Sequence, residues 1–106
     1  NGKATFWGPG MGACGWTRKE TDLVAALPIG LWNKLGGTIT NGNIVCGHKL
    51  KVSNGKVAVT VEITDQCGSC EDVHLDLSPA AFDQLGPKEK GILDISWGWI
   101  GPVPHQ

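Results

Sequence analysis

The stretch VEITDQCGSCEDVHLDLSPAAF, residues 61–82, holds the elements that decide the fold. Residues 73–77 alternate between apolar and polar side chains, which predicts a strand with one apolar and one polar face. Ser78 follows as a helix N-cap, and Pro79 fits the first helical position, where no backbone N–H is needed. Asp76 therefore closes a strand immediately before a helix. By itself this pattern is typical of a carboxylate that faces solvent, as most polar side chains do.

The segment upstream predicts a β-hairpin. Residues 46–52 lead into the turn Ser53-Asn54-Gly55, and residues 56–65 lead out of it. Asn-Gly is a strong signal for a tight hairpin turn. In the second arm the alternating apolar positions from Val57 to Ile63 are expected to face the core together.

The remaining segments predict short elements that are separated by turns. Residues 3–7 and 92–100 predict the first and last strands, and residues 29–35 predict one or two helical turns. Residues 22–27 fit a helix or a strand equally well, and Pro28 ends either one. The 16 glycines and the many Val, Ile and Thr residues favour a mainly β chain with many turns. Five or six strands this short are typical of a small barrel or sandwich.

Length and charge exclude several classes of partner. The 106 residues are close to the common size of one domain, so we expect residues 1–106 to form a single domain. Nine Lys and Arg against ten Asp and Glu leave a net charge of −1, which lacks the basic excess of a nucleic-acid-binding surface. No apolar run approaches the ~20 residues of a membrane span. We expect neither nucleic acid nor membrane as a partner.

The chain contains an even number of cysteines: Cys14, Cys46, Cys67 and Cys70. In a small glycine-rich domain this favours two disulfides and an oxidising compartment, with three possible pairings. A zinc site is an alternative, because Cys67, Cys70 and His74 lie near Cys46 and His48 in a pattern of ligand-like residue types. That pattern lacks the regular spacing of zinc modules. Free thiols are the third possibility.

Five motifs occur in an order that resembles a known family. They are ATFWG (4–8), GACGW (12–16), VEITDQCGSC (61–70), LDLSPAAF (75–82) and ISWGWI (95–100). Over residues 3–100 the chain resembles the double-psi β-barrel of expansins, and especially the single-domain fungal expansin-like proteins called loosenins. The resemblance implies a mainly β, six-stranded double-psi β-barrel with short helices and a groove that binds polysaccharide. With this fold in view we predict the disulfides Cys14–Cys46 and Cys67–Cys70.

The resemblance also implies the residues of the site. Asp76 and Asp65 are expected to line the groove. Thr5 lies two residues before Trp7 on the same face of the first strand, so it can hydrogen-bond a sugar or the acid. Trp7 is a candidate for stacking on sugar rings, with a core position as the alternative. No cofactor and no metal are expected.

A departure at Gly8 argues against hydrolysis. Related inverting endoglucanases share the barrel, and their acid occupies the position of Asp76. Inverting hydrolysis needs a second carboxylate as base, roughly 6.5–9.5 Å from the acid. The base position corresponds to Gly8, which has no side chain. Asp65 is expected to raise the proton affinity of Asp76 without serving as a base on the opposite face of the sugar.

We therefore expect a secreted, monomeric and non-hydrolytic protein that loosens cellulose, chitin or related wall polysaccharides. The chain ends at Gln106, so no second, polysaccharide-holding domain is expected. One alternative is a weak glycoside hydrolase or lytic enzyme that uses Asp76 as its acid. Another is an inhibitor of papain-like proteases, which a protruding apolar loop at residues 28–32 would favour.

The remaining aromatic and histidine side chains are assigned by their neighbours. Trp97 and Trp99 share a strand face with an isoleucine and are expected to face the core. Trp16, beside a cysteine, is expected to be structural. His48 and His74 are expected at the surface.

Overall fold

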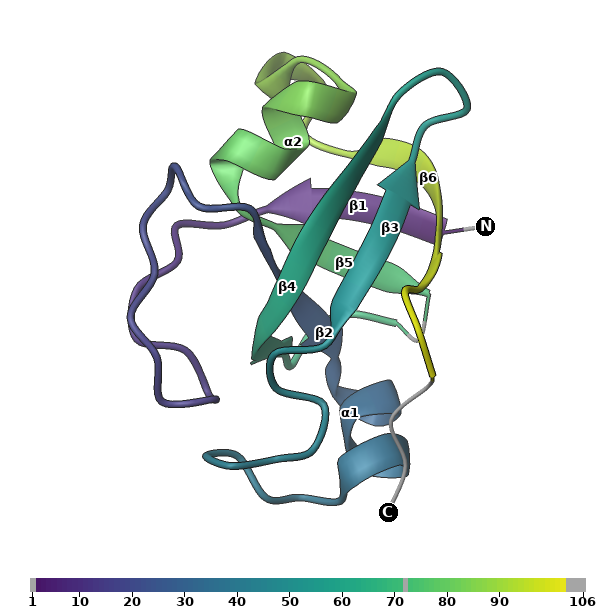
Figure 1. Cartoon of the computed structure of the whole chain (residues 1–106). Coiled ribbons are helices and arrows are strands. Elements are labelled where there is room, and N and C mark those ends of the chain that lie inside the picture. Colours follow the sequence, from purple (N-terminus) through teal and green to yellow (C-terminus); the bar gives the residue numbers. More distant parts are fainter. Residues whose placement is uncertain (1, 72, 103–106) are drawn as a thin grey trace.

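Six strands close into a barrel in the order β1-β5-β2-β4-β3-β6 (Figure 1). The computed structural model describes residues 2–71 and 73–102. The strands are β1 (Gly2–Phe6), β2 (Val24–Pro28), β3 (Lys49–Ser53), β4 (Ala58–Cys67), β5 (His74–Leu77) and β6 (Leu93–Trp99). Two helices, α1 (Ile29–Gly36) and α2 (Pro79–Leu85), and a 3₁₀ turn, η1 (Lys88–Lys90), lie outside the barrel. The prediction of a mainly β, six-stranded barrel with short helices is confirmed.

The barrel mixes parallel and antiparallel pairs around one apolar core. β1 pairs with β5 and β2 with β4 in parallel, and the other four pairs are antiparallel. Alternate residues of each strand point inward, as the pleat requires. The interior is filled mainly by branched aliphatic side chains that are almost wholly buried: Leu27, Leu50, Val52, Val61, Ile63, Leu75 and Leu77.

The hairpin forms as predicted, but its strands begin later than expected. β3 begins at Lys49, and β4 begins at Ala58. Asn54 Oδ1 accepts hydrogen bonds from the backbone N–H groups of Lys56 and Val57, which tightens the turn. The expectation that Val57 faces the core is wrong. It belongs to the turn, and its side chain is 46% exposed.

The ambiguous segment before Pro28 is a strand. All five residues of β2 are buried, because β4 and β5 flank it and its outer face is covered as well. A strand that is buried on both faces has a continuous apolar sequence, so it lacks the alternation that would identify it. Residues 28–32 do not form the protruding loop that would favour a protease inhibitor, and the helical turns predicted at residues 29–35 are confirmed. Pro28 ends β2, α1 begins at Ile29, and Trp32 is fully buried with its Nε1–H donating to the Ile39 carbonyl.

Ser78 joins the end of β5 to the start of α2. Its Oγ accepts from the Ala81 N–H, which caps α2, and from the Val24 N–H, and it donates to the Asp22 carbonyl at 2.6 Å. One buried hydroxyl thus ties α2 and β2 to the strand that carries Asp76. The N-cap predicted at Ser78 is confirmed.

Two disulfides join Cys14 to Cys46 and Cys67 to Cys70. This is the pairing predicted from the sequence. All four sulfurs are consumed in S–S bonds, so no cysteine of the described chain remains as a thiolate ligand for zinc or as a free thiol. Among residues 2–71 and 73–102, no helix has the length and apolar character needed to cross a membrane.

Candidate functional site

Four adjacent strands place one residue each in a continuous row across the barrel. In the sheet register Asp65 of β4 stands beside Ala26 of β2, Ala26 beside Asp76 of β5, and Asp76 beside Thr5 of β1. We call these four residues the Asp76 row. Neighbouring strands lie about 4.8 Å apart, so the backbones at Asp65 and Asp76 are separated by about 10 Å. Three of the four predicted binding residues therefore belong to one row.

A bulge in β4 turns Asp65 to the outside of the barrel. Ile63 pairs with Ala25, but the next pair is Asp65 with Ala26, so Thr64 is an extra residue. Without it, Asp65 would share the inward face of Ile63, two residues earlier. The extra residue instead places Asp65 on the face of Ala26, opposite to that of Ala25 in the core. The acidic pair of the row depends on this bulge.

The loop between β1 and β2 docks on this bulge. Asp65 Oδ1 accepts hydrogen bonds from the backbone N–H groups of Ala13 and Gln66, each at 2.8 Å. The Cys14 N–H donates to the Thr64 carbonyl at 3.2 Å. A Cβ at Gly12 would collide with the Thr64 carbonyl, so only glycine allows this approach. Asp65 therefore holds the loop in place in addition to any contact that it makes with a ligand.

Asp76 lies in a short hydrogen-bonded chain with Thr5 and His74. Thr5 Oγ1 is 3.0 Å from Asp76 Oδ1 and 3.0 Å from His74 Nε2. His74 and Asp76 are two residues apart in β5, and the parallel pairing with β1 places Thr5 opposite Asp76. His74 is half-buried, so its assignment as an ordinary surface residue is wrong. Its position at i−2 from Asp76, on the same strand face, is the signal that could have identified it.

Burial raises the pKa of the Asp76 carboxyl above its ordinary value, and the negative charge of Asp65 raises it further. The hydrogen bond from Thr5 and the positive charge of His74 act in the opposite direction but do not cancel the effect of burial. The expected direction of the shift is thus correct, while its main cause is desolvation and not the second carboxylate. Asp76 keeps its proton to higher pH than a solvated aspartate does.

Trp7 and Gly8 follow directly after β1. The Trp7 N–H donates to the Leu77 carbonyl at 3.0 Å, which brings this segment beside the end of β5, and the side chain is half-buried. Gly8 is exposed, and a Cβ at this position would have no neighbour within 4 Å. There is room for a side chain at this position, but glycine has none.

The other aromatic residues are not members of the row. Trp97 and Trp99 pack edge to face against each other, with ring centroids 6.2 Å apart, and both lie half-buried against the core, in agreement with the expected inward face. His48 packs on Trp99 in the same way and is half-buried, which corrects its assignment to the surface. Trp16 is 36% exposed, so more of its side chain meets solvent than was expected for a structural residue. The Arg18 guanidinium lies 5.1 Å from the centre of the Trp16 ring.

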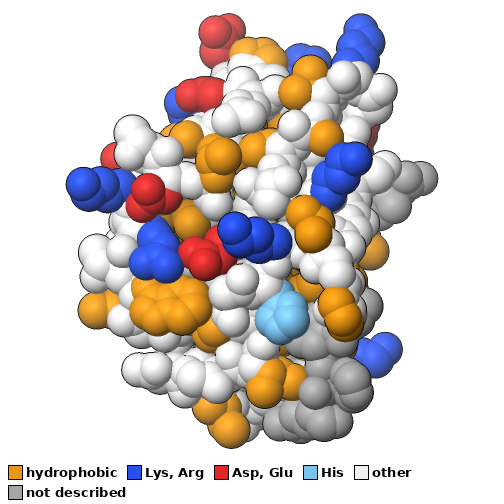
Figure 2. Space-filling model, in the orientation of Figure 1, with side chains coloured by type: hydrophobic (Ala, Val, Ile, Leu, Met, Phe, Trp, Pro, Cys, Tyr) orange, Lys and Arg blue, Asp and Glu red, His pale blue; other side chains and the backbone are white. Residues whose placement is uncertain are grey.

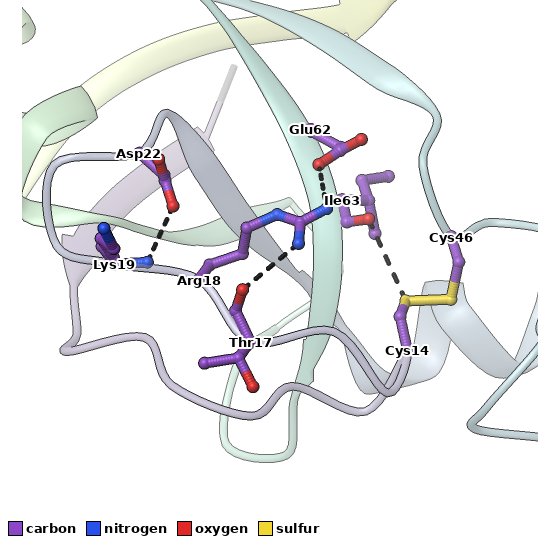
Figure 3. Close-up of polar contacts among 8 residues, drawn as sticks. All are labelled: Cys14, Thr17, Arg18, Lys19, Asp22, Cys46, Glu62 and Ile63. Atoms are coloured by element: carbon purple, nitrogen blue, oxygen red, sulfur yellow. Dashed lines mark hydrogen bonds and ion pairs between the residues drawn. A yellow bond between two sulfur atoms is a disulfide. The ribbon is translucent and has the colours of Figure 1, made fainter.

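A hollow of about 610 Å³ lies on the outer side of β4. Arg18 reaches across it to Glu62 at 3.1 Å, and Asp22 accepts a hydrogen bond from the backbone N–H of Lys19 (Figure 3). Figure 2 shows that acidic and basic side chains alternate across this face of the molecule. The hollow includes no residue of the Asp76 row. Because Arg18 and Glu62 pair with each other, we do not assign this hollow to ligand binding.

The barrel and its motifs place the chain among known proteins. A family model described as lytic transglycolase, of double-psi β-barrel type, matches residues 1–97. The chain belongs to this double-psi β-barrel family. The expected resemblance to expansins is confirmed as well, since expansin-like protein 3 of Dictyostelium discoideum is 49% identical over 65 residues, which cover 57% of this chain and 19% of that protein.

Streptomyces papain inhibitors match almost the whole chain in sequence and in structure. The papain inhibitor of Streptomyces mobaraensis is 35% identical over 104 residues, 93% of this chain and 70% of that protein. The solved structure of a Streptomyces papain inhibitor superposes with a TM-score of 0.83 at 31% identity, over 92% of this chain and 90% of that one.

An expansin provides the other structural comparison. A mutant expansin of Clavibacter michiganensis, solved in complex with cellohexaose, superposes with a TM-score of 0.78 at 29% identity, over 93% of this chain and 48% of that chain. The present chain thus spans about half the length of that expansin and about a fifth of the Dictyostelium relative.

Proposed function

We propose that this expansin-like chain binds cell-wall polysaccharide, such as cellulose or chitin, along the Asp76 row and loosens it without cleaving it. The observation that carries the proposal is the row itself, with Asp76 half-buried, hydrogen-bonded to Thr5 and two strands away from Asp65. Trp7 adds a half-buried aromatic side chain next to β5. Two disulfides fit a secreted protein.

The chemistry of Asp76 suits sugar hydroxyls. A protonated carboxyl both donates and accepts hydrogen bonds, whereas a carboxylate only accepts. The raised pKa of Asp76 keeps the carboxyl protonated to a higher pH than that of a solvated aspartate. A sugar hydroxyl also donates and accepts, so either form of Asp76 can pair with it. The Clavibacter expansin in complex with cellohexaose supports a glucan as the kind of ligand.

The arrangement of carboxylates supports binding without hydrolysis. Asp65 and Asp76 lie along one face of one sheet, and Asp65 Oδ1 is already engaged by two backbone N–H groups. An inverting hydrolase instead holds its base across the sugar ring from its acid. Gly8, at the position of that base, has no side chain.

The main enzymatic alternative is a lytic transglycosylase, which requires other catalytic groups than an inverting hydrolase does. It breaks the glycosidic bond by attack of a hydroxyl of the sugar itself, so it needs an acid but no carboxylate to activate water. Asp76 alone could supply that acid. Assays must therefore look for anhydro-sugar products, which are lighter than hydrolysis products by one water molecule, as well as for new reducing ends.

Inhibition of a papain-like protease is a second candidate, favoured by the near full-length match to the papain inhibitors. Such a function would use another surface. The loop at residues 7–23 carries Met11, which is 70% exposed, and the loop at residues 37–48 carries exposed Ile39 and Ile44. The Cys14–Cys46 disulfide joins the two loops.

One pair of variants separates the two candidates. Met11→Asp should impair inhibition of papain and leave polysaccharide binding intact, whereas Asp76→Ala should do the reverse. Pull-downs on amorphous cellulose and chitin, run beside a papain titration on the same preparations, decide between them. Loss of cellulose and chitin binding only in Met11→Asp would contradict the assignment of the Asp76 row.

A further inference from the structure

The Thr5 hydroxyl lies between the side chains of His74 and Asp76 and has a single proton to donate. Thr5 Oγ1 lies 3.0 Å from a ring nitrogen of His74 on one side and 3.0 Å from a carboxyl oxygen of Asp76 on the other. A threonine hydroxyl has one hydrogen to donate and lone pairs that accept. It can therefore donate to only one of these two neighbours and must accept from the other. The two hydrogen bonds therefore point the same way along the series His74, Thr5 and Asp76.

The ionised form of Asp76 fixes that direction, whereas a protonated Asp76 allows it to reverse. When Asp76 is ionised it can only accept, so Thr5 donates to Asp76 Oδ1 and His74 Nε2–H donates to Thr5. When Asp76 instead carries a proton on Oδ1, it donates to Thr5, and Thr5 donates to an unprotonated Nε2. His74 is then the neutral tautomer with its hydrogen on Nδ1.

We infer that His74 is a positioning residue, which directs the Thr5 hydroxyl onto Asp76 and so sets the form in which Asp76 meets a ligand. With Nε2–H as donor, the Thr5 hydrogen is held on Asp76 Oδ1, and the ionised form of Asp76 is favoured. Without that donor the Thr5 hydroxyl is free to rotate away. The part of the inference that concerns a ligand rests on the proposed function, whereas the coupling within the free protein does not.

Other charged groups near the row do not substitute for His74. On β1, Lys3 pairs with His74 in the register but forms an ion pair with Asp94 of β6. From β4 the nearest carboxyl is Asp65, whose negative charge raises the pKa of Asp76. On β2 the neighbour of Asp76 is Ala26, which does not titrate. His74 is the cationic group that acts on Asp76 both by its charge and through Thr5.

The direct test is an NMR titration of the Asp76 carboxyl carbon in the free protein. We expect the pKa of Asp76 to be higher in His74→Leu than in wild type, because both the positive charge and the donor to Thr5 are lost. His74→Gln should give a smaller rise, since its side-chain amide can still donate to Thr5. In a Thr5→Val background, His74→Leu should have a smaller effect than in wild type, because only the effect of charge remains.

His48→Leu is the matched control, because His48 is also half-buried but packs on Trp99 instead of on the row. It should leave the titration of Asp76 unchanged. A purely structural His74 would lower the melting temperature without moving that titration. An Asp76 titration identical in wild type and His74→Leu, or shifted equally by His48→Leu, overturns the inference.

Binding of cellohexaose across pH then connects the coupling to the ligand. The midpoint of any pH dependence should move upward in His74→Leu, in parallel with the Asp76 titration. If wild type binds none of cellohexaose, amorphous cellulose and chitin, the proposed function fails, and the carboxyl titration still decides the coupling. If binding is present and its pH profile is the same in wild type and His74→Leu, the inference about the ligand is wrong.

Discussion

Asp65 and Asp76 stand on opposite sides of Ala26, and each is its direct neighbour in the barrel sheet. The alanine methyl group is the only side chain between them in the row, so the two carboxyl groups share one face across a small apolar step. This geometry sets the two hydrogen-bonding groups side by side on one sheet, as the proposed binding of a linear polysaccharide requires. It does not place them above and below a sugar ring.

The raised pKa of Asp76 predicts that removing its charge stabilises the protein at neutral pH. A folded-state pKa above that of the unfolded chain means that Asp76 favours folding while protonated, and that this contribution is lost as pH rises through the folded-state pKa. Asp76→Asn should therefore raise the melting temperature at pH 7, and the gain should disappear near pH 3. The effect should stay below ~1 kcal/mol, because the side chain lies outside the core.

Asp94→Asn is a control of opposite sign. The hydrogen bond and charge of Lys3 lower the pKa of Asp94, so its contribution is present above the unfolded pKa and lost as pH falls. The variant should melt slightly lower than wild type at pH 7 and equally at pH 2. Thermal melts over this pH range measure both variants. The same pH trend in both would show that the assigned shifts are wrong.

Two glycines of one loop should respond differently to a methyl group. In Gly12→Ala the Cβ collides with the Thr64 carbonyl at the bulge, so we expect a loss of about 1–3 kcal/mol in the free energy of unfolding. In Gly8→Ala the Cβ meets no atom within 4 Å, so stability should be unchanged or slightly increased. Urea denaturation measures both. Equal effects would contradict the docking of this loop on β4.

The two disulfides should differ in their effect on stability. The Cys14–Cys46 bond spans 32 residues of sequence and the Cys67–Cys70 bond spans 3. In the chain-entropy model these closures contribute about 3.7 and about 1.6 kcal/mol. Because the Cys67–Cys70 closure contributes less to the stability of the fold, a mild thiol reductant should open it first. Alkylation with mass mapping after brief reduction checks the order, and early opening of Cys14–Cys46 would contradict it.

Prolonged incubation with soluble glucans, chitin oligosaccharides or peptidoglycan should yield no cleavage products. The absence of a carboxylate at Gly8 and the placement of Asp65 beside Asp76 are the reasons to expect no hydrolysis. The absence of anhydro products is the part of the prediction that tests the transglycosylase alternative. A reducing-sugar assay detects hydrolysis, and mass spectrometry detects anhydro products. Release that Asp76→Asn abolishes would make Asp76 a catalytic acid and this protein an enzyme.

The sequence predicted the parts of the site that local rules control. Alternation along residues 73–77 and the Ser78-Pro79 cap placed Asp76 at the end of a strand on its polar face. The family resemblance added Asp65, and the position of Thr5 two residues before Trp7 on one strand face added Thr5. These features depend on neighbours along the chain, and the sequence contains them directly.

What the sequence did not predict depends on contacts between distant segments. No glycine or proline marks the bulge at Thr64, which appears only when β4 is aligned with β2. The strand state of β2 was ambiguous because a strand buried on both faces shows no alternation. The position of His74 two residues before Asp76 suggested a shared strand face, but its hydrogen bond to Thr5 joins residues that are 69 apart in the chain.

The most direct test of the central claim is a depletion isotherm on amorphous cellulose and chitin for wild type and Asp76→Ala, with the folded fraction of each protein measured by thermal melting. We expect wild type to bind at least one of them. Asp76→Ala should weaken that binding about 2–10-fold, the equivalent of one hydrogen bond, and cost less than ~1 kcal/mol of stability. If wild type binds neither polymer, or if the mutant melts far lower while its affinity per folded molecule is unchanged, then Asp76 is a structural hydrogen-bonding residue and the proposed function is wrong.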